Sequence, residues 1–289
     1  MKLAMNKRRR DAFWGAGLCA PAIIVLAVGL ALPLVRIVYM SLSTGEGIGL
    51  DNFARVLSDK NLGAAIANSL VFTGVSVAAH LVLGLVFASL VNFDLNPHYV
   101  KIARGALIIP WAISPVVVAT IFRLLYQPEL SVLSGLFKSI PVMAQGILTN
   151  KSFALFAVIF INVWYAMPFY FLLFLARIQS IPKEIYEAAH LDGSTYVQSL
   201  FYISFPVLKP LIVILGIYDV VAAFNTFDLV WLTTQGGPGG ATEVLATYIY
   251  RTAYRGKLDF NYAAAMGIVL LLLITAACAA VWSIGRERD

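Results

Sequence analysis

Long apolar stretches alternate with short polar segments along the chain. A helix needs about 20 apolar residues to cross the hydrocarbon core of a bilayer, where no water can bond a free backbone amide. Six stretches reach that length, at roughly 14–40, 69–92, 103–126, 153–176, 211–232 and 262–284. The pattern therefore predicts an all-α membrane protein with six transmembrane helices in a single domain over residues 14–284.

Basic residues predict which side of the membrane each segment faces. One lysine and three arginines at 7–10 lie directly before the first span, and positively charged flanks stay in the cytoplasm. Six spans then place both ends on that side, the basic N-terminus at 1–13 and the tail at 285–289. The predicted cytoplasmic loops are 93–102 and 177–210, and the predicted outward loops are 43–68, 127–152 and 233–261.

Composition excludes other classes of protein. Of the 289 residues, 60% are hydrophobic and 12% are charged, which lies outside the range of soluble domains. The net charge of +6 then reflects membrane topology, because no basic face with interleaved aromatic residues indicates nucleic-acid binding. Three residues of the last outward loop, Arg251, Arg255 and Lys257, run against the charge rule. The two cysteines, Cys19 and Cys278, fall in predicted spans and are expected to act as small apolar side chains.

The sequence holds no recognisable catalytic, nucleotide-binding or metal-binding signature. The Gly256-Lys257 pair lacks the preceding glycine of a phosphate-binding loop. The three histidines, His80, His98 and His190, are scattered over one span and two loops, so no metal site is expected. His80, within the second span, is expected to be a hydrogen-bonded packing residue rather than a proton relay. We therefore expect a non-catalytic membrane subunit with no cofactor of its own.

A polar segment within the second cytoplasmic loop predicts a short helix. Pro182 suits a first helical turn, where its missing amide costs nothing. Glu184 and Glu187 then lie near the positive end of the helix dipole. Gly193 supplies the left-handed residue that commonly ends a helix, and a second segment follows from 195 to 203. On periodicity alone, this helix could equally lie flat on the membrane surface.

The same segment carries a distinctive pattern. It reads Glu187-Ala188-Ala189-His190-Leu191-Asp192-Gly193 and is followed by Ile203-Ser204-Phe205-Pro206. The pattern resembles the EAA loop of binding-protein-dependent ABC importers, which docks into a groove on the ATPase subunit and has a leucine in place of Phe205. The resemblance implies a type I ABC importer permease fold, with ATP and Mg²⁺ held by separate ATPase subunits. It also implies an ATPase-coupling set, consisting of Glu184, Glu187, Ala188, Ala189, Asp192 and Gly193.

A second pattern follows the fifth predicted span. Residues Thr234 to Pro238 read Thr-Gln-Gly-Gly-Pro, which looks like the T-x-G-G-P turn of sugar-type ABC permeases, although such a sequence also forms an ordinary tight turn. The similarity covers about residues 65–285 and looks closest to the larger subunit of maltose-type permeases and its relatives for trehalose, other glycosides and glycerol phosphate. It implies a place in the bacterial inner membrane beside a second permease, an ATPase homodimer and an extracytoplasmic solute-binding protein. The other residues that carry it are Pro110, Trp111, Trp164 and Pro168.

Polar side chains within the fifth span predict where a solute binds. Such groups are costly in a bilayer and usually face a cavity or another helix. At about 100° per residue, Asp219, Ala223 and Thr226 share one stripe of a helix, whereas Asn225 and Asp228 lie towards the opposite side. The resemblance matches the stripe to positions that contact sugar in the larger maltose-type subunit. Asp219 is therefore the preferred acceptor for solute hydroxyls, and Ala223 argues against maltose itself.

Two further spans offer aromatic and polar faces. Asn162, Tyr165 and Phe169 share a face of the fourth span, and Trp111 and Ser114 share one of the third. Aromatic rings stack on the apolar faces of pyranoses, and the resemblance matches Trp111, Tyr165 and Phe169 to sugar contacts, although aromatic residues at this spacing also serve packing. No basic residue lies on these faces, which favours a neutral glycoside or polyol unless the partner permease donates an arginine. The predicted substrate-binding set is Trp111, Ser114, Asn162, Tyr165, Phe169, Asp219, Asn225, Thr226 and Asp228.

Two functions remain open. The first is a transmembrane permease subunit of an ATP-driven importer, forming the translocation pathway for a sugar delivered by the binding protein. The second is a stand-alone proton- or ion-coupled carrier that uses Asp219 and Asp228 and transports without an ATPase. The EAA and glycine-rich patterns together favour the first.

Overall fold

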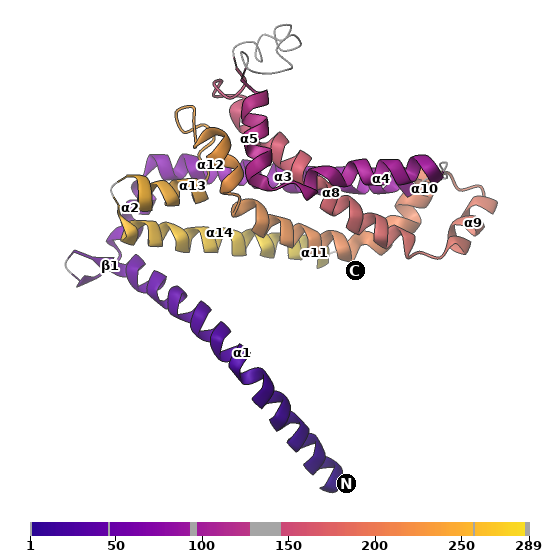
Figure 1. The fold of residues 1–289 in the computed structure, drawn as a ribbon, viewed down its shortest axis with the longest axis horizontal. Helices are drawn as coiled ribbons and strands as arrows, with labels where there is room; N and C mark the ends of the chain where they lie inside the picture. The colour runs from indigo at the N-terminus through magenta and orange to yellow at the C-terminus, as the bar shows by residue number, and fades with distance from the viewer. Residues whose placement is uncertain (1, 46, 93–96, 128–145, 257, 287–289) are drawn as a thin grey trace. The chain divides into compact units, whose positions relative to one another are not determined.

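The computed structural model describes residues 2–45, 47–92, 97–127, 146–256 and 258–286. The predicted loop residues 93–96 and 128–145, Lys257 and the tail residues 287–289 lie outside this set. The described chain is almost entirely helical (Figure 1). Its α-helices are α1 (Lys2–Leu42), α2 (Asp51–Ser58), α3 (Lys60–Asn92), α4 (Pro97–Ala112), α5 (Pro115–Leu125), α8 (Ala154–Gln179), α9 (Lys183–Leu191), α10 (Tyr196–Ser199), α11 (Phe205–Phe224), α12 (Asp228–Thr234), α13 (Leu245–Tyr250) and α14 (Phe260–Arg286). The other described elements are two short strands, β1 (Ser43–Thr44) and β2 (Gly47–Ile48), and two π-helical segments, η1 (Leu200–Ser204) and η2 (Arg251–Arg255).

Membrane-crossing segments match the predicted number. Within the described residues, five helices are long and apolar enough to cross a bilayer, and a bent pair makes a sixth. The single helices are Trp14–Leu42, Lys60–Asn92, Ala154–Gln179, Tyr196–Phe224 and Phe260–Gly285. The prediction of an all-α protein with six such segments is therefore confirmed. The second segment begins at Lys60, inside the predicted outward loop 43–68, and the third and fifth also differ from their predicted form.

The third segment is broken rather than continuous. Val100–Ala112 and Pro115–Leu125 meet at an angle of 95°, where the sequence predicts one span over 103–126. Ser114 is extended, with φ −61° and ψ 138°, because a residue before proline is driven out of the helical region. Pro115 has no amide to continue the helical ladder. Pro115 therefore marks the break in the sequence, although the hydropathy pattern alone predicts one continuous span.

The fifth segment lies earlier in the chain than the predicted 211–232. It begins at Tyr196, where Thr195 and Gln198 form a capping box, and it runs through η1 into α11. It ends at Phe224, and beyond it the side chains of Asn225 and Thr226 bond back to the carbonyls of Val221 and Ala222 at 2.8 and 3.1 Å. Such local bonds compete with the helical ladder. The second half of the predicted 177–210 loop is consequently part of a span.

Two compact units make up the chain, and the larger comprises residues 59–251 and 270–289. Here α3 packs along α8 more extensively than any other pair of elements, and α4, α5 and α11 pack around them (Figure 1). One apolar cluster gathers around Phe72, Val158 and Ile161. A second gathers around Phe171 and Phe174. These clusters fix the relative positions of the helices that carry the candidate site.

A close helix contact explains Gly84 of α3. A Cβ atom at this position would lie 2.8 Å from Cβ of Tyr170 and 3.1 Å from the backbone nitrogen of Phe171 on α8. Small residues let membrane helices approach closely enough for extensive van der Waals packing. Gly84 therefore brings the middle of α3 against the part of α8 that carries Tyr170.

The smaller unit comprises residues 1–58 and 252–269. Its hairpin of β1 and β2 is antiparallel, and the buried Asn52 of α2 donates hydrogen bonds to the carbonyls of Ser41 and Ser43 at 3.2 and 2.9 Å. Arg55 forms an ion pair with Asp259 at 2.9 Å and lies 4.2 Å from the ring centre of Tyr262. These contacts join α2 to the start of α14.

Candidate functional site

The predicted coupling helix is present as α9. Pro182 directly precedes it, and Asp192 caps its end. Gly193 adopts a left-handed conformation with φ +82°, which L-residues with a side chain rarely accept. Its amide donates to the carbonyl of His190 at 3.0 Å. The prediction of a short helix ended by Gly193 is confirmed.

The α9 helix presents its surface outward. None of its residues is buried, and the apolar side chains of Leu191 and Ile185 are 88% and 47% exposed. The predicted coupling residues Glu184, Glu187, Ala188, Asp192 and Gly193 are likewise exposed, and Ala189 is partly buried. Exposed apolar side chains of this kind are typical of a surface that contacts another protein.

Hydrogen bonds tie the coupling segment to the bundle. The Tyr186 hydroxyl lies 2.8 Å from the Ser204 hydroxyl in η1. The Tyr196 hydroxyl donates to the backbone carbonyl of Ser89 near the end of α3. Tyr186 thus attaches α9 to the fifth span, and Tyr196, the first residue of the fifth span, attaches that span to the second span. A displacement of α9 would therefore reach the fifth span directly and the second span through the fifth.

A buried polar pair joins α3, α8 and α11. His80 Nδ1 lies 2.8 Å from Asp219 Oδ2, and His80 Nε2 lies 3.3 Å from the carbonyl oxygen of Asn162. The His80 ring also stacks on Tyr170, with ring centres 4.9 Å apart and an interplanar angle of 6°. The expectation that His80 is a hydrogen-bonded packing residue is confirmed.

Hydrogen-bond chemistry defines the protonation of this pair. A carbonyl oxygen can only accept, so Nε2 must carry a hydrogen. The short Nδ1 to Oδ2 contact then needs one more proton, held either by the imidazolium or by the carboxylic acid. In both arrangements the His80–Asp219 pair has no net charge, which is the form that burial within a membrane favours.

The stripe of α11 that carries Asp219 and Ala223 faces the interior of the larger unit. Asp219 is 2% exposed and Ala223 is buried with it, so both face other helices of the unit. Tyr218 and Asn225 lie on the outward side of this stretch, with Tyr218 55% exposed. Thus Asp219, the preferred solute ligand of the sequence analysis, meets His80 in this structure, and its role as a solute contact stays a prediction.

Three aromatic rings from three helices form what we call the aromatic ledge, consisting of Trp111, Phe169 and Tyr218. Trp111 of α4 and Phe169 of α8 have ring centres 5.7 Å apart. Tyr218 of α11 lies 5.5 Å from Phe169. The structure therefore brings together two predicted site residues and adds Tyr218, which the sequence analysis missed. Its position seven residues before Asn225, on the same helix face, was the available signal.

The remaining predicted site residues are placed differently. Ser114 is exposed at the break between α4 and α5, and Tyr165 is partly buried. Asn162 is buried. Thr226 follows α11, and Asp228 begins α12 as an exposed residue. The carboxylates of Asp219 and Asp228 therefore lie in separate surroundings, one buried against α3 and the other exposed at a helix start.

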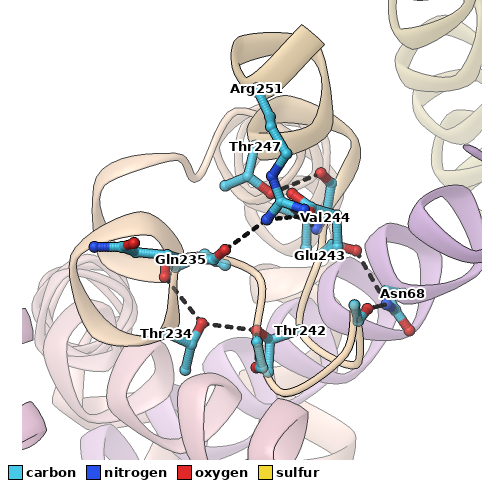
Figure 2. Close-up of polar contacts among 11 residues, drawn as sticks. Asn68, Thr234, Gln235, Thr242, Glu243, Val244, Thr247 and Arg251 are labelled. Atoms are coloured by element: carbon cyan, nitrogen blue, oxygen red, sulfur yellow. Dashed lines mark hydrogen bonds and ion pairs between the residues drawn. The ribbon is translucent and has the colours of Figure 1, made fainter. Parts of the chain in front are cut away.

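The glycine-rich loop from Thr234 to Gly240 is held by a polar network (Figure 2). The Thr242 hydroxyl donates to the carbonyl of Gly237 and lies 2.7 Å from the Thr234 hydroxyl. Asn68 of α3 donates to the carbonyls of Gly240 and Glu243 at 3.1 and 3.0 Å. These bonds attach the loop to the N-terminal part of α3. The C-terminal part of the same helix accepts the hydrogen bond from Tyr196.

An ion pair closes this network. Arg251 Nη2 lies 2.5 Å from Glu243 Oε2 and donates to the carbonyl of Gln235 at 2.7 Å, as Figure 2 shows. The Glu243 side chain is only 5% exposed, and burial raises its pKa, although a hydrogen bond from Thr247 and the charge of Arg251 oppose the shift. A Cβ on Gly236 would lie 2.6 Å from Glu243 Oε2. The ion pair offsets the charge of Arg251, one of the basic residues that run against the predicted topology.

Together these features define a class of protein: a polytopic transport subunit with a broken span and an exposed helix between two spans. The chain belongs to the family of binding-protein-dependent transport system inner membrane components, whose model matches residues 80–281. It is accordingly a multi-pass protein of the inner membrane, as the sequence predicted.

Curated relatives align along nearly the whole chain. The trehalose/maltose transport system permease protein MalF of Thermococcus litoralis is 29% identical over 99% of this chain and 98% of its own. The sulfoquinovosyl glycerol transport system permease protein SmoG of Agrobacterium fabrum is 31% identical over 94% and 90%. The sn-glycerol-3-phosphate transport system permease protein UgpA of Yersinia pestis is 30% identical over 89% and 88%.

Solved structures share the fold. A chain of a bacterial ABC transporter involved in the import of the acidic polysaccharide alginate superposes with a TM-score of 0.87 and 24% identity, and the match covers 100% of both chains. A chain of the alginate transporter in complex with an alginate pentasaccharide-bound periplasmic protein gives a TM-score of 0.85 and 25% identity, over 98% of this chain and 96% of that one. The ABC importer type I permease-like fold implied by the EAA resemblance agrees with these matches.

Proposed function

We propose that this chain is a permease subunit of an ATP-driven importer and forms part of the translocation pathway for a sugar or glycoside. The observation that carries the proposal is α9, an exposed helix with the EAA pattern that is hydrogen-bonded to the fifth span, which is in turn bonded to the second span. The names of the relatives add that permeases of this kind serve transport of trehalose, maltose and other glycosides.

The proposed assembly contains a second permease, two copies of an ATPase that hold ATP and Mg²⁺, and an external solute-binding protein. ATP binding closes the ATPase dimer, and α9 moves with it. The Tyr186–Ser204 and Tyr196–Ser89 bonds pass this displacement to α11 and α3. The bundle then changes from inward-open to outward-open, with both termini on the cytoplasmic side, and solute enters from the binding protein.

The proposed solute site lies beside the break in the third span. Ser114, Tyr165 and the predicted members of the aromatic ledge, Trp111 and Phe169, offer rings for pyranose faces and hydroxyls for hydrogen bonds. These residues carry no formal charge, so a neutral glycoside suits them better than an anion. The relatives named for sn-glycerol 3-phosphate and sulfoquinovosyl glycerol handle anions, and an anionic solute here would need a basic side chain from the partner permease.

Gly193→Glu tests the coupling role of α9. Space is not the obstacle, because a Cβ at Gly193 meets nothing within 4 Å, but its φ of +82° strains any side chain. We expect the variant to insert normally while losing ATPase association or ATP-driven uptake. Uptake of radiolabelled trehalose, maltose and sn-glycerol 3-phosphate would be measured in proteoliposomes that contain the complete assembly.

The matched control is Gln198→Glu, which adds the same charge nearby. Glutamate preserves the capping box with Thr195, so this variant should transport like the unmodified chain. Normal uptake by Gly193→Glu, with the ATPase still bound, would remove α9 from the coupling mechanism.

A further inference from the structure

The exposed face of α11 is a different face from the one that carries Asp219 and Ala223, which the sequence analysis chose as the solute-binding stripe. Ile214, Tyr218 and Val221 are exposed at successive turns, and Asn225 continues the stripe beyond the helix end. Asp219, the next residue, lies about 100° further around the helix, is buried and is bonded to His80. Any solute that passes along α11 therefore meets Tyr218 before it can meet Asp219.

We infer that Tyr218 is a substrate-contacting residue that determines specificity, with its ring against the apolar face of a neutral pyranose and its hydroxyl bonded to a sugar hydroxyl. This inference rests on the proposed function and extends it. Tyr218 supplies the third ring of the aromatic ledge and the only hydroxyl in that set of three. A phenol can combine stacking with a hydrogen bond, which suits a sugar better than a purely apolar ligand.

A buried stack behind the ledge holds Tyr218 in place. Phe169 meets Tyr170 edge to face, with ring centres 5.3 Å apart, and Tyr170 stacks on His80. Because His80 also bonds Asp219, the rotation of α11 about its axis is fixed at the residue next to Tyr218. The ring is thus positioned before any solute arrives, which lowers the ordering cost of binding.

The surroundings of the aromatic ledge favour a water-filled pathway over contact with lipid. Trp111 lies three residues before the exposed Ser114, at the 95° break of the third span. Irregular backbone at membrane depth is tolerated only when it is buried in protein or lines a water-filled cavity. Exposed hydroxyls at Ser114 and Tyr218 carry the same cost against acyl chains. The ledge holds no charged side chain, so its occupant is a neutral sugar rather than an ion.

The test compares Tyr218→Phe with Tyr218→Leu in the complete assembly in proteoliposomes. Radiolabelled trehalose, maltose and sn-glycerol 3-phosphate are the probes, and kcat and KM for uptake are measured beside basal ATPase activity. Tyr218→Leu removes the ring and should lower kcat/KM for the transported glycoside about tenfold, the equivalent of one lost stacking contact. Tyr218→Phe keeps the ring and should lower kcat/KM about threefold, because only the hydroxyl's hydrogen bond is lost.

Phe156→Leu is the matched control, because Phe156 of α8 is also an exposed ring and lies outside the ledge. It should transport like the unmodified chain. Unchanged kcat/KM in Tyr218→Leu overturns the inference while leaving the proposed function intact. Failure of Tyr218→Leu to assemble with the second permease also overturns it, because the ring would then belong to the subunit interface. If the unmodified assembly takes up none of the probes, the sugar-import proposal itself fails.

Discussion

Two adjacent residues of α11, Tyr218 and Asp219, differ in the direction in which their side chains point. Asp219 faces inward and completes a neutral pair with His80, while Tyr218 faces outward beside Phe169. An acid within a membrane span is a reasonable candidate for a solute ligand. Here the same cost is offset by a histidine on another helix. Asp219 therefore joins α11 to α3 through His80, and the exposed Tyr218 is the residue that we infer meets the solute.

Substitution of Asp219 distinguishes these roles. Asp219→Asn should fold almost normally, because an amide can donate to Nδ1 of a neutral His80. Asp219→Ala leaves His80 Nδ1 without its partner and should lower the free energy of unfolding by about 1–3 kcal/mol. Thermal unfolding of the purified variants in detergent gives the comparison. Weakened uptake by Asp219→Ala at unchanged stability would instead support the solute contact that the sequence predicted.

At the scale of elements, the sequence predicts what depends on local chemistry. Six apolar lengths predict six spans, and Gly193 predicts the end of α9, because both follow from neighbouring residues. The start of the fifth span at Tyr196 escaped the hydropathy pattern, since Gln198 and Lys209 dilute the apolar signal there. Helical periodicity shows that Asp219 and Ala223 share a face. It does not show that the face looks inward, because that depends on a histidine 139 positions away.

The glycine-rich loop is an element whose stability should depend on pH through Glu243. Burial raises the pKa of this carboxyl, so the folded loop binds a proton more readily than the unfolded chain does. That contribution to stability is complete below the ordinary glutamate pKa and is lost as the pH rises through the raised value. The melting temperature of the unmodified protein should therefore fall across this window relative to that of Glu243→Gln, which has no such proton to lose.

The control for this measurement is Glu187→Gln, an exposed carboxylate on α9 that should leave the pH profile unaltered. Arg251→Ala serves as the complementary variant, because it leaves Glu243 buried without its cation. It should lower stability at neutral pH by about 1–3 kcal/mol, less than a fully buried pair would lose because the arginine is partly exposed. Parallel pH profiles for the unmodified protein and Glu243→Gln would show that the carboxyl does not titrate differently on folding.

At the scale of the whole molecule, the proposed function requires that the energy for concentrative transport enters from outside this chain. The sequence has no phosphate-binding loop, and the two carboxylates that a proton-coupled carrier would use lie in separate surroundings. Asp219 is buried and bonded to His80, and Asp228 is exposed at the start of α12. Under the proposed function, α9 and its hydrogen bond to the fifth span are the route by which work reaches the bundle.

The proposed function predicts a strict dependence on partners. The purified chain alone in liposomes should not accumulate trehalose, maltose or sn-glycerol 3-phosphate, even with a proton or sodium gradient imposed. Addition of the second permease, the ATPase subunits with ATP and Mg²⁺, and the loaded binding protein should produce concentrative uptake. An ATPase variant that binds but does not hydrolyse ATP is the control and should abolish it. Gradient-driven accumulation by the chain alone would establish the carrier function instead, because transport would then need neither an ATPase nor coupling through α9.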